Sequence, residues 1–155
     1  MANTFSQINL HIVFAVKYRE KLISETWEDD LHKYISGIVR LKNQKLLAIN
    51  GMPDHIHIFI SIVPSCSIAD LVREIKKSST QFVNSKGYCN KNFRWQEGYG
   101  VFSHHRNSTS KVVNYILNQK KHHSKESYED EFIRTLKDHE VDFDLKYTFD
   151  SRDEE

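Results

Sequence analysis

The sequence predicts an α+β fold in which helices pack against one antiparallel sheet. Three observations support this class. Apolar residues alternate along short β-rich segments, they recur at helical spacing along longer segments, and the two kinds of segment interchange along the chain. A length of 155 residues and a hydrophobic content of 39% suit a single domain with a real core.

The first part of the chain predicts a strand, a helix and a hairpin. Apolar residues alternate over 8–17, which indicates a strand, and recur at helical spacing over 26–43. Acidic residues in the first turn of that helix favour it through the helix dipole. Two further strands, 45–50 and 55–63, flank the turn at 50–53 and are close enough to form a hairpin.

The middle of the chain predicts a capped helix and another strand. Ser67 precedes an apolar stripe over 68–82 and stands three residues before an acidic residue, as in a capping box. Residues 95–103 follow a polar loop and predict a strand that Gly98 and Gly100 interrupt. Glycine inside a strand indicates a bulge or a close approach of another group.

The remaining segments predict helices at 109–122 and 125–138, followed by a short extended segment over 143–149. The resulting order, β-α-β-β-α-β and then helices, is that of the ferredoxin-like split βαβ fold. Its helices lie on one face of the sheet, so we expect the other face to be open to a ligand. The fold alone does not define a function.

The hairpin carries a pair of histidines suited to metal binding. In a strand, Ile56, Ile58 and Ile60 share the core face, whereas His55 and His57 share the opposite face. Two neutral imidazoles in this arrangement can hold one divalent ion. A polar strand surface is the simpler interpretation of the pair taken alone.

A second constellation lies on the helix predicted at 109–122. Tyr115 and Gln119 are four residues apart and therefore share a helix face, with Lys111 and His122 on the same side. A tyrosine hydroxyl becomes an effective nucleophile towards a phosphate that a metal polarises. The amide oxygen of glutamine is a hard ligand that can complete a two-histidine site.

The charge distribution favours a phosphate-bearing partner. Residues 1–125 carry 18 Lys and Arg against 9 Asp and Glu, whereas residues 126–155 carry 4 against 12. The basic body suits nucleic acid. No apolar run is long enough for a bilayer, no secretory signal is visible, and Cys66 and Cys89 lack metal-site spacing, so we expect a cytoplasmic protein without membrane contact.

These motifs resemble those of the IS200/IS605-type single-tyrosine (Y1) transposases of the HUH nuclease superfamily. His55-Ile56-His57 is similar to the family's His-hydrophobic-His motif, and the segment 115–119 is similar to its Tyr-Ile-x-Asn-Gln motif. The segment 95–103 resembles a third landmark. The resemblance covers about residues 5–125, which predicts a catalytic domain at 1–125 and a C-terminal helix with an acidic tail at 126–155.

The resemblance implies a DNA transposase that cuts and rejoins single-stranded DNA at insertion-element ends through a 5′-phosphotyrosine. Tyr115 would be the nucleophile, and His55, His57 and Gln119 would hold Mg²⁺ or Mn²⁺, with no nucleotide cofactor. The implied partners are DNA with hairpin ends and a second copy of the chain in a homodimer. The basic residues expected to hold the DNA backbone are Arg73, Lys76, Lys77 and Lys111.

Three alternatives remain open: a ferredoxin-like nucleic-acid-binding module without chemistry, a metal-dependent phosphodiesterase that hydrolyses DNA, and a domesticated transposase with a host role. The binding module is disfavoured because His55, His57, Phe59 and Ser61 make a poor platform for stacking bases. Among the other histidines, we expect His11 to be structural. The adjacent pairs at 104–105 and 122–123 are expected at the surface or on phosphates.

Overall fold

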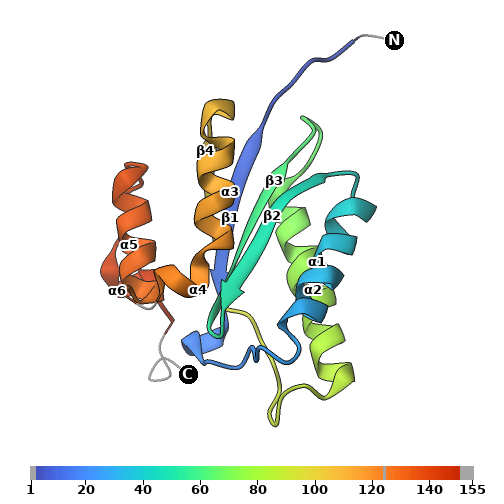
Figure 1. The fold of residues 1–155 in the computed structure, drawn as a ribbon, viewed down its shortest axis with the longest axis vertical. Coiled ribbons are helices and arrows are strands. Elements are labelled where there is room, and N and C mark those ends of the chain that lie inside the picture. The colour runs from blue at the N-terminus through green and yellow to red at the C-terminus, as the bar shows by residue number, and fades with distance from the viewer. Residues whose placement is uncertain (1–2, 124, 151–155) are drawn as a thin grey trace.

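A computed structural model of the chain describes residues 3–123 and 125–150 (Figure 1). Its sheet has the strand order β2-β3-β1-β4, and every neighbouring pair is antiparallel. The strands are β1 (Asn9–Ala15), β2 (Lys45–Met52), β3 (His55–Ser61) and β4 (Gly100–His104). Together with the first two helices, this order and pairing confirm the ferredoxin-like prediction.

Helices α1 (Glu28–Leu41) and α2 (Ile68–Lys86) cover one face of the sheet, and the main core lies beneath them. Ser67 caps α2 as predicted, because its side chain accepts a hydrogen bond of 3.2 Å from the backbone N–H of Asp70. The alternation predicted for the strands is also confirmed. The residues that it places in this core are Leu10, Ile12, Phe14, Ile56, Ile58 and Ile60.

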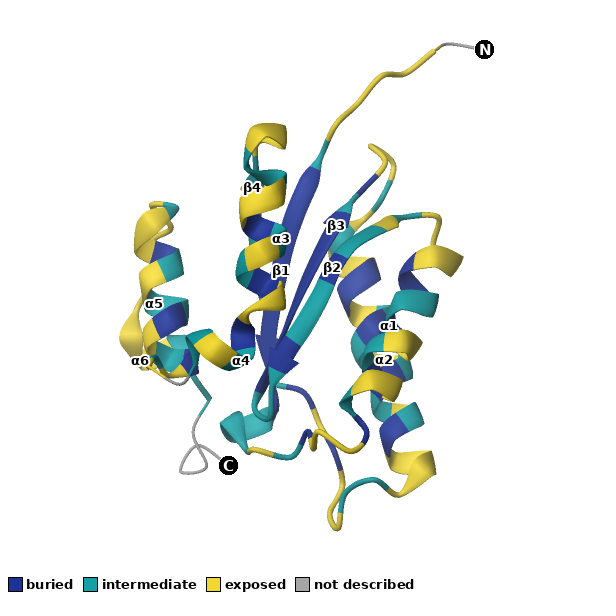
Figure 2. Cartoon of the chain, in the orientation of Figure 1, coloured by how far each residue is buried: buried dark blue, intermediate teal, exposed yellow. Residues whose placement is uncertain are grey.

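The opposite face is covered as well, so the prediction of an open face is wrong. Helices α3 (Thr109–Leu117), α4 (Gln119–His122) and α5 (Tyr128–Asp138) lie along it (Figure 1). The reason is that the strands are apolar on both sides. The residues that these helices bury there are Val13, Ala15, Ala48, Phe59 and Phe102. Figure 2 shows how much of the sheet is buried between the two layers.

The helix predicted at 109–122 is broken into α3 and α4. Asn118 separates them with non-helical backbone angles, φ −97° and ψ 19°. At this break the carbonyl of Leu117 is exposed and accepts a hydrogen bond of 3.1 Å from the side-chain amide of Asn50 on β2. The break turns the chain at the point where Gln119 begins α4.

Two other boundaries differ from the prediction. The strand expected at 95–103 begins at Gly100, and Trp95 makes only an isolated bridge to Val16. Gly100 marks a close approach, since a Cβ atom there would lie 2.7 Å from the ring of Phe132 on α5. The tail at 143–149 forms the short helix α6 (Leu145–Thr148) instead of an extended segment, because the side chain of Asp144 caps its first turn.

Two short 3₁₀ helices, Lys17–Arg19 and Arg106–Ser108, complete the described structure. The segment after residue 125 packs on the sheet through Tyr128 and Leu136, while the division at 125/126 stays a prediction. Within 3–123 and 125–150, no helix is long and apolar enough to cross a membrane.

Candidate metal and tyrosine site

The two histidines of β3 project from the sheet into the layer formed by α3, α4 and α5, and both are fully buried. Each has one ring nitrogen fixed by a neighbour: His55 Nδ1 lies 2.6 Å from Asp54 Oδ1, and His57 Nδ1 lies 2.7 Å from Nε2 of His11. Such contacts orient metal-binding imidazoles and set their tautomer. Burial lowers the pKa of His57 to about 4, so its ring is neutral at physiological pH, as a ligand must be.

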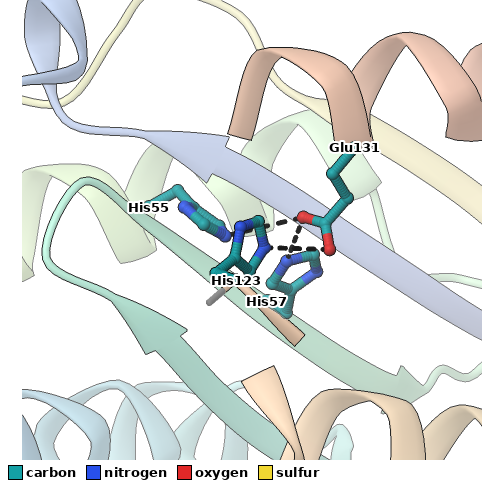
Figure 3. Close-up of side chains that lie close together, drawn as sticks. All are labelled: His55, His57, His123 and Glu131. Carbon is teal, nitrogen blue, oxygen red and sulfur yellow. Dashed lines mark hydrogen bonds and ion pairs between the residues drawn. The ribbon is translucent and has the colours of Figure 1, made fainter. Parts of the chain in front are cut away.

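The Nε2 atoms of both histidines converge on the carboxylate of Glu131, which α5 delivers from the other side of the layer (Figure 3). Glu131 Oε1 lies 2.9 Å from His57 Nε2 and 3.5 Å from His55 Nε2. Burial alone would raise the pKa of the Glu131 carboxyl. The contacts with the His123 and His57 rings outweigh burial and hold that pKa well below its usual range, so the group is a carboxylate.

His123 and Gln119 complete the cluster from α4 and the residue that follows it. His123 Nε2 lies 3.0 Å from Glu131 Oε2, and only 4% of its side chain is exposed. This contact lacks the geometry of a hydrogen bond, so the nitrogen is buried without a proper partner. Gln119 is buried, and its Oε1 lies 3.4 Å from His55 Nε2. The predicted ligands His55, His57 and Gln119 therefore meet in one place.

Tyr115 lies at the edge of the same cluster. Its hydroxyl donates a hydrogen bond to Glu131 Oε2 and accepts one of 3.0 Å from Arg134 Nη2. The His122 ring nitrogen Nε2 lies 3.4 Å from the same hydroxyl. Burial and the Glu131 carboxylate raise the pKa of the Tyr115 phenol, so the hydroxyl is protonated in this arrangement. One carboxylate thus links the predicted nucleophile to the predicted metal ligands.

The donor spacing fits a single divalent ion. Metal–nitrogen and metal–oxygen bonds of about 2.1 Å place adjacent ligand atoms about 3.0–3.4 Å apart in octahedral or tetrahedral geometry. Glu131 Oε1 lies 2.9 Å from His57 Nε2 and 3.5 Å from His55 Nε2, Glu131 Oε2 lies 3.0 Å from His123 Nε2, and Gln119 Oε1 lies 3.4 Å from His55 Nε2. The buried His123 Nε2 has no hydrogen-bond partner and could therefore bind a metal ion. The residues present therefore fit a metal centre.

The four residues predicted to bind DNA do not lie together. Lys111 lines two hollows, of about 380 and 520 Å³, that adjoin Tyr115. Arg73, Lys76 and Lys77 line a groove beside α2, on the face of the sheet remote from the histidines. One of these cations also stabilises the fold, because Lys76 Nζ donates a hydrogen bond of 2.8 Å to the carbonyl of Gln96.

Sequence reasoning missed Glu131, His123 and the orienting role of His11. The pair at 122–123 was expected at the surface, but the side chain of His123 is buried in the cluster. A signal for Glu131 was present: it is three residues from the buried Tyr128 and so shares a face of α5 with it. An acidic residue on an inward helix face requires a polar partner.

The fold and the site together define the class of small tyrosine transposases. A family model described as "Transposase IS200 like" matches residues 4–119. The chain is 30% identical over 125 residues to the transposase for insertion sequence element IS200 of Salmonella typhimurium, a match that covers 77% of this chain and 81% of that protein. It is 26% identical over 125 residues to the ISDra2 transposase TnpA of Deinococcus radiodurans, a match that covers 77% of this chain and 87% of that protein. The chain belongs to the IS200-like transposase family.

Solved structures agree with this fold. A protein assigned as a transposase from Deinococcus radiodurans R1 matches with a TM-score of 0.62 and 22% identity, over 77% of this chain and 95% of that chain. A REP-associated tyrosine transposase bound to a REP hairpin matches with a TM-score of 0.56 and 20% identity, over 76% of this chain and 70% of that chain. The family match ends at residue 119, so His123 and Glu131 lie beyond it.

Proposed function

We propose that this transposase cuts and rejoins single-stranded DNA at insertion-element ends, with Tyr115 as the nucleophile. His55, His57 and Gln119 hold the divalent metal. The observation that carries the proposal is the convergence of these four residues around one buried carboxylate. A nucleophile adjacent to metal ligands is the arrangement that metal-assisted phosphoryl transfer requires.

In the cut, a bond forms between Tyr115 Oη and phosphorus while the bond from phosphorus to the 3′ oxygen breaks. The phenol loses its proton and the 3′ oxygen gains one, which leaves a 5′-phosphotyrosine and a free 3′ hydroxyl. Arg134, which contacts Tyr115 Oη at 3.0 Å, stabilises the negative charge that develops there. When bound, a divalent ion supplies Lewis-acid polarisation of the scissile phosphate. Rejoining is the same step in reverse.

The DNA would reach Tyr115 through the hollows beside α3, where Lys111 and Lys125 meet the phosphate backbone. A relative with a solved structure is bound to a hairpin, which supports DNA with hairpin ends as the partner. The groove of Arg73, Lys76 and Lys77 is the site that we propose for a more distant part of this DNA. A homodimer would supply two tyrosines for the two cuts that excision requires.

The test uses a hairpin oligonucleotide with Mg²⁺ or Mn²⁺ and denaturing gels, where a 3′ label follows the fragment joined to the tyrosine and a 5′ label follows the released fragment. Tyr115→Phe keeps the ring and should abolish the covalent adduct, whereas the matched control Tyr147→Phe, at an exposed tyrosine of α6, should retain it. His57→Ala should abolish cleavage but spare DNA binding. An adduct formed by Tyr115→Phe would overturn the assignment and direct attention to Tyr18 and Tyr99.

The same experiment separates the alternative functions. A binding module without chemistry would bind the hairpin and give no cleavage with any metal. A hydrolytic phosphodiesterase would cleave the oligonucleotide equally well as Tyr115→Phe, because its nucleophile is a water molecule. Cleavage that requires Tyr115 and leaves a protein–DNA adduct fits the tyrosine mechanism and excludes both of these alternatives.

A further inference from the structure

The segment after residue 119 places two more metal donors at the predicted centre. Glu131 Oε1 faces both β3 histidines, and His123 Nε2 faces Glu131 Oε2 (Figure 3). One donor atom from each of His55, His57, His123 and Glu131 can be chosen so that all four lie within 4.8 Å of one another. We propose that His123 and Glu131 are metal ligands in addition to His55, His57 and Gln119, so that the centre contains three imidazoles and one carboxylate besides the Gln119 amide. This inference rests on the proposed function and names the ligands of its metal.

Burial supports a ligand role for both residues. Glu131 is 1% exposed, and a carboxylate at such a depth needs positive charge or several donors around it. The described contacts of its two oxygens are to the rings of His57 and His123, the Tyr115 hydroxyl and the Gln119 amide. The guanidinium of Arg134 contacts Tyr115 and Glu126 instead of Glu131. A divalent ion would place positive charge directly beside this carboxylate. It would also satisfy His123 Nε2, which lacks a hydrogen bond with acceptable geometry.

The two oxygens of Glu131 then have separate roles. Oε1 faces the histidines and would bind the ion, whereas Oε2 accepts the hydrogen bond from the Tyr115 hydroxyl. Glu131 would therefore hold the nucleophile next to the metal centre. Three neutral imidazoles and one carboxylate around a divalent ion leave a net charge of +1, which suits an anionic phosphodiester.

The donor set also predicts which metal is preferred. Mg²⁺ prefers oxygen ligands and retains several waters, whereas imidazole suits the first-row transition ions. A centre with three imidazoles should thus bind Mn²⁺ more tightly than Mg²⁺, by at least about tenfold. A centre built only from two histidines and Gln119 would discriminate less between these ions.

The test measures Mn²⁺ alone, with the full chain and without DNA. Electron paramagnetic resonance titration gives the affinity, and pulsed measurements count the imidazole nitrogens that bind the ion. We expect three imidazoles in the native chain and two in His123→Ala. Glu131→Gln should lower the affinity for Mn²⁺ by at least about tenfold. The control Glu129→Gln, two residues away on α5 and paired with Arg19, should leave that affinity unchanged.

The count in the native chain needs no substitution, so it tests the inference even where a variant fails to fold. A count of two imidazoles that His57→Ala reduces, with no change in His123→Ala, would overturn the inference and leave the proposed function intact. Equal affinities of Glu131→Gln and Glu129→Gln would exclude Glu131 as a ligand. Absence of Mn²⁺ binding would overturn both metal assignments, while the Tyr115 adduct would still test the nucleophile.

Discussion

Gly51 is the position where a single methyl group should disturb the histidine strand most. It lies on β2 opposite Ile56 of β3. A Cβ atom at Gly51 would lie 2.4 Å from the carbonyl oxygen of His55 and 3.1 Å from the Cα of Ile56. Both atoms belong to the backbone of β3, which also pairs with β1, so neither can move without shifting the strand. Overpacking of this kind lowers the free energy of unfolding by about 1–3 kcal/mol.

Urea denaturation of Gly51→Ala measures this effect. At an m-value of about 2 kcal/mol/M, the midpoint should fall by about 0.5–1.5 M with the slope unchanged. Gly37→Ala is the matched control, because Gly37 lies in the middle of α1 and a Cβ atom there meets nothing within 4 Å. That change should instead stabilise the protein by about 0.5–1 kcal/mol through helix propensity.

The same pair of variants links stability to the site. Displacement of the His55 backbone should weaken Mn²⁺ binding in Gly51→Ala and leave it unchanged in Gly37→Ala. A Gly51→Ala protein as stable as the native chain, with native Mn²⁺ affinity, would refute the reasoning. It would mean that the hairpin accommodates the methyl group by a shift that leaves the histidines in place.

Three further predictions concern single contacts and assembly. Ser79→Ala removes the acceptor of the 2.9 Å hydrogen bond from the Trp95 indole, so the free energy of unfolding should fall by about 1–3 kcal/mol; an unchanged urea midpoint would contradict this. His11→Ala removes the partner that orients His57, so Mn²⁺ affinity should fall by about 10–100-fold and His11→Gln should recover part of it; a native affinity in His11→Ala would refute the role. A mixture of Tyr115→Phe and His57→Ala chains should stay inactive, because one chain already brings its own tyrosine to its own histidines. Recovered cleavage would demonstrate sites shared between the two chains of a dimer, and a monomer in sedimentation that cleaves and rejoins DNA would refute the dimer.

The sequence by itself determined the elements whose signals are local. Alternation placed Ile56 and Ile58 in the core and the two histidines of β3 on the other face, because side chains on a strand alternate. Helical spacing likewise placed Tyr115 and Gln119 on one side. The break at Asn118 did not separate them, since α4 continues from the turn with Gln119 directed at His55.

Only the tertiary structure decided what covers the histidines. Helical periodicity shows that α5 has an inward face but does not state which surface that face meets, so Glu131 could not be assigned to His57, 74 residues away. The pairing of His11 with His57 likewise depends on the register between β1 and β3. These contacts join segments distant in sequence, and their positions follow from how apolar surfaces on both faces of the sheet are buried, which no local pattern specifies.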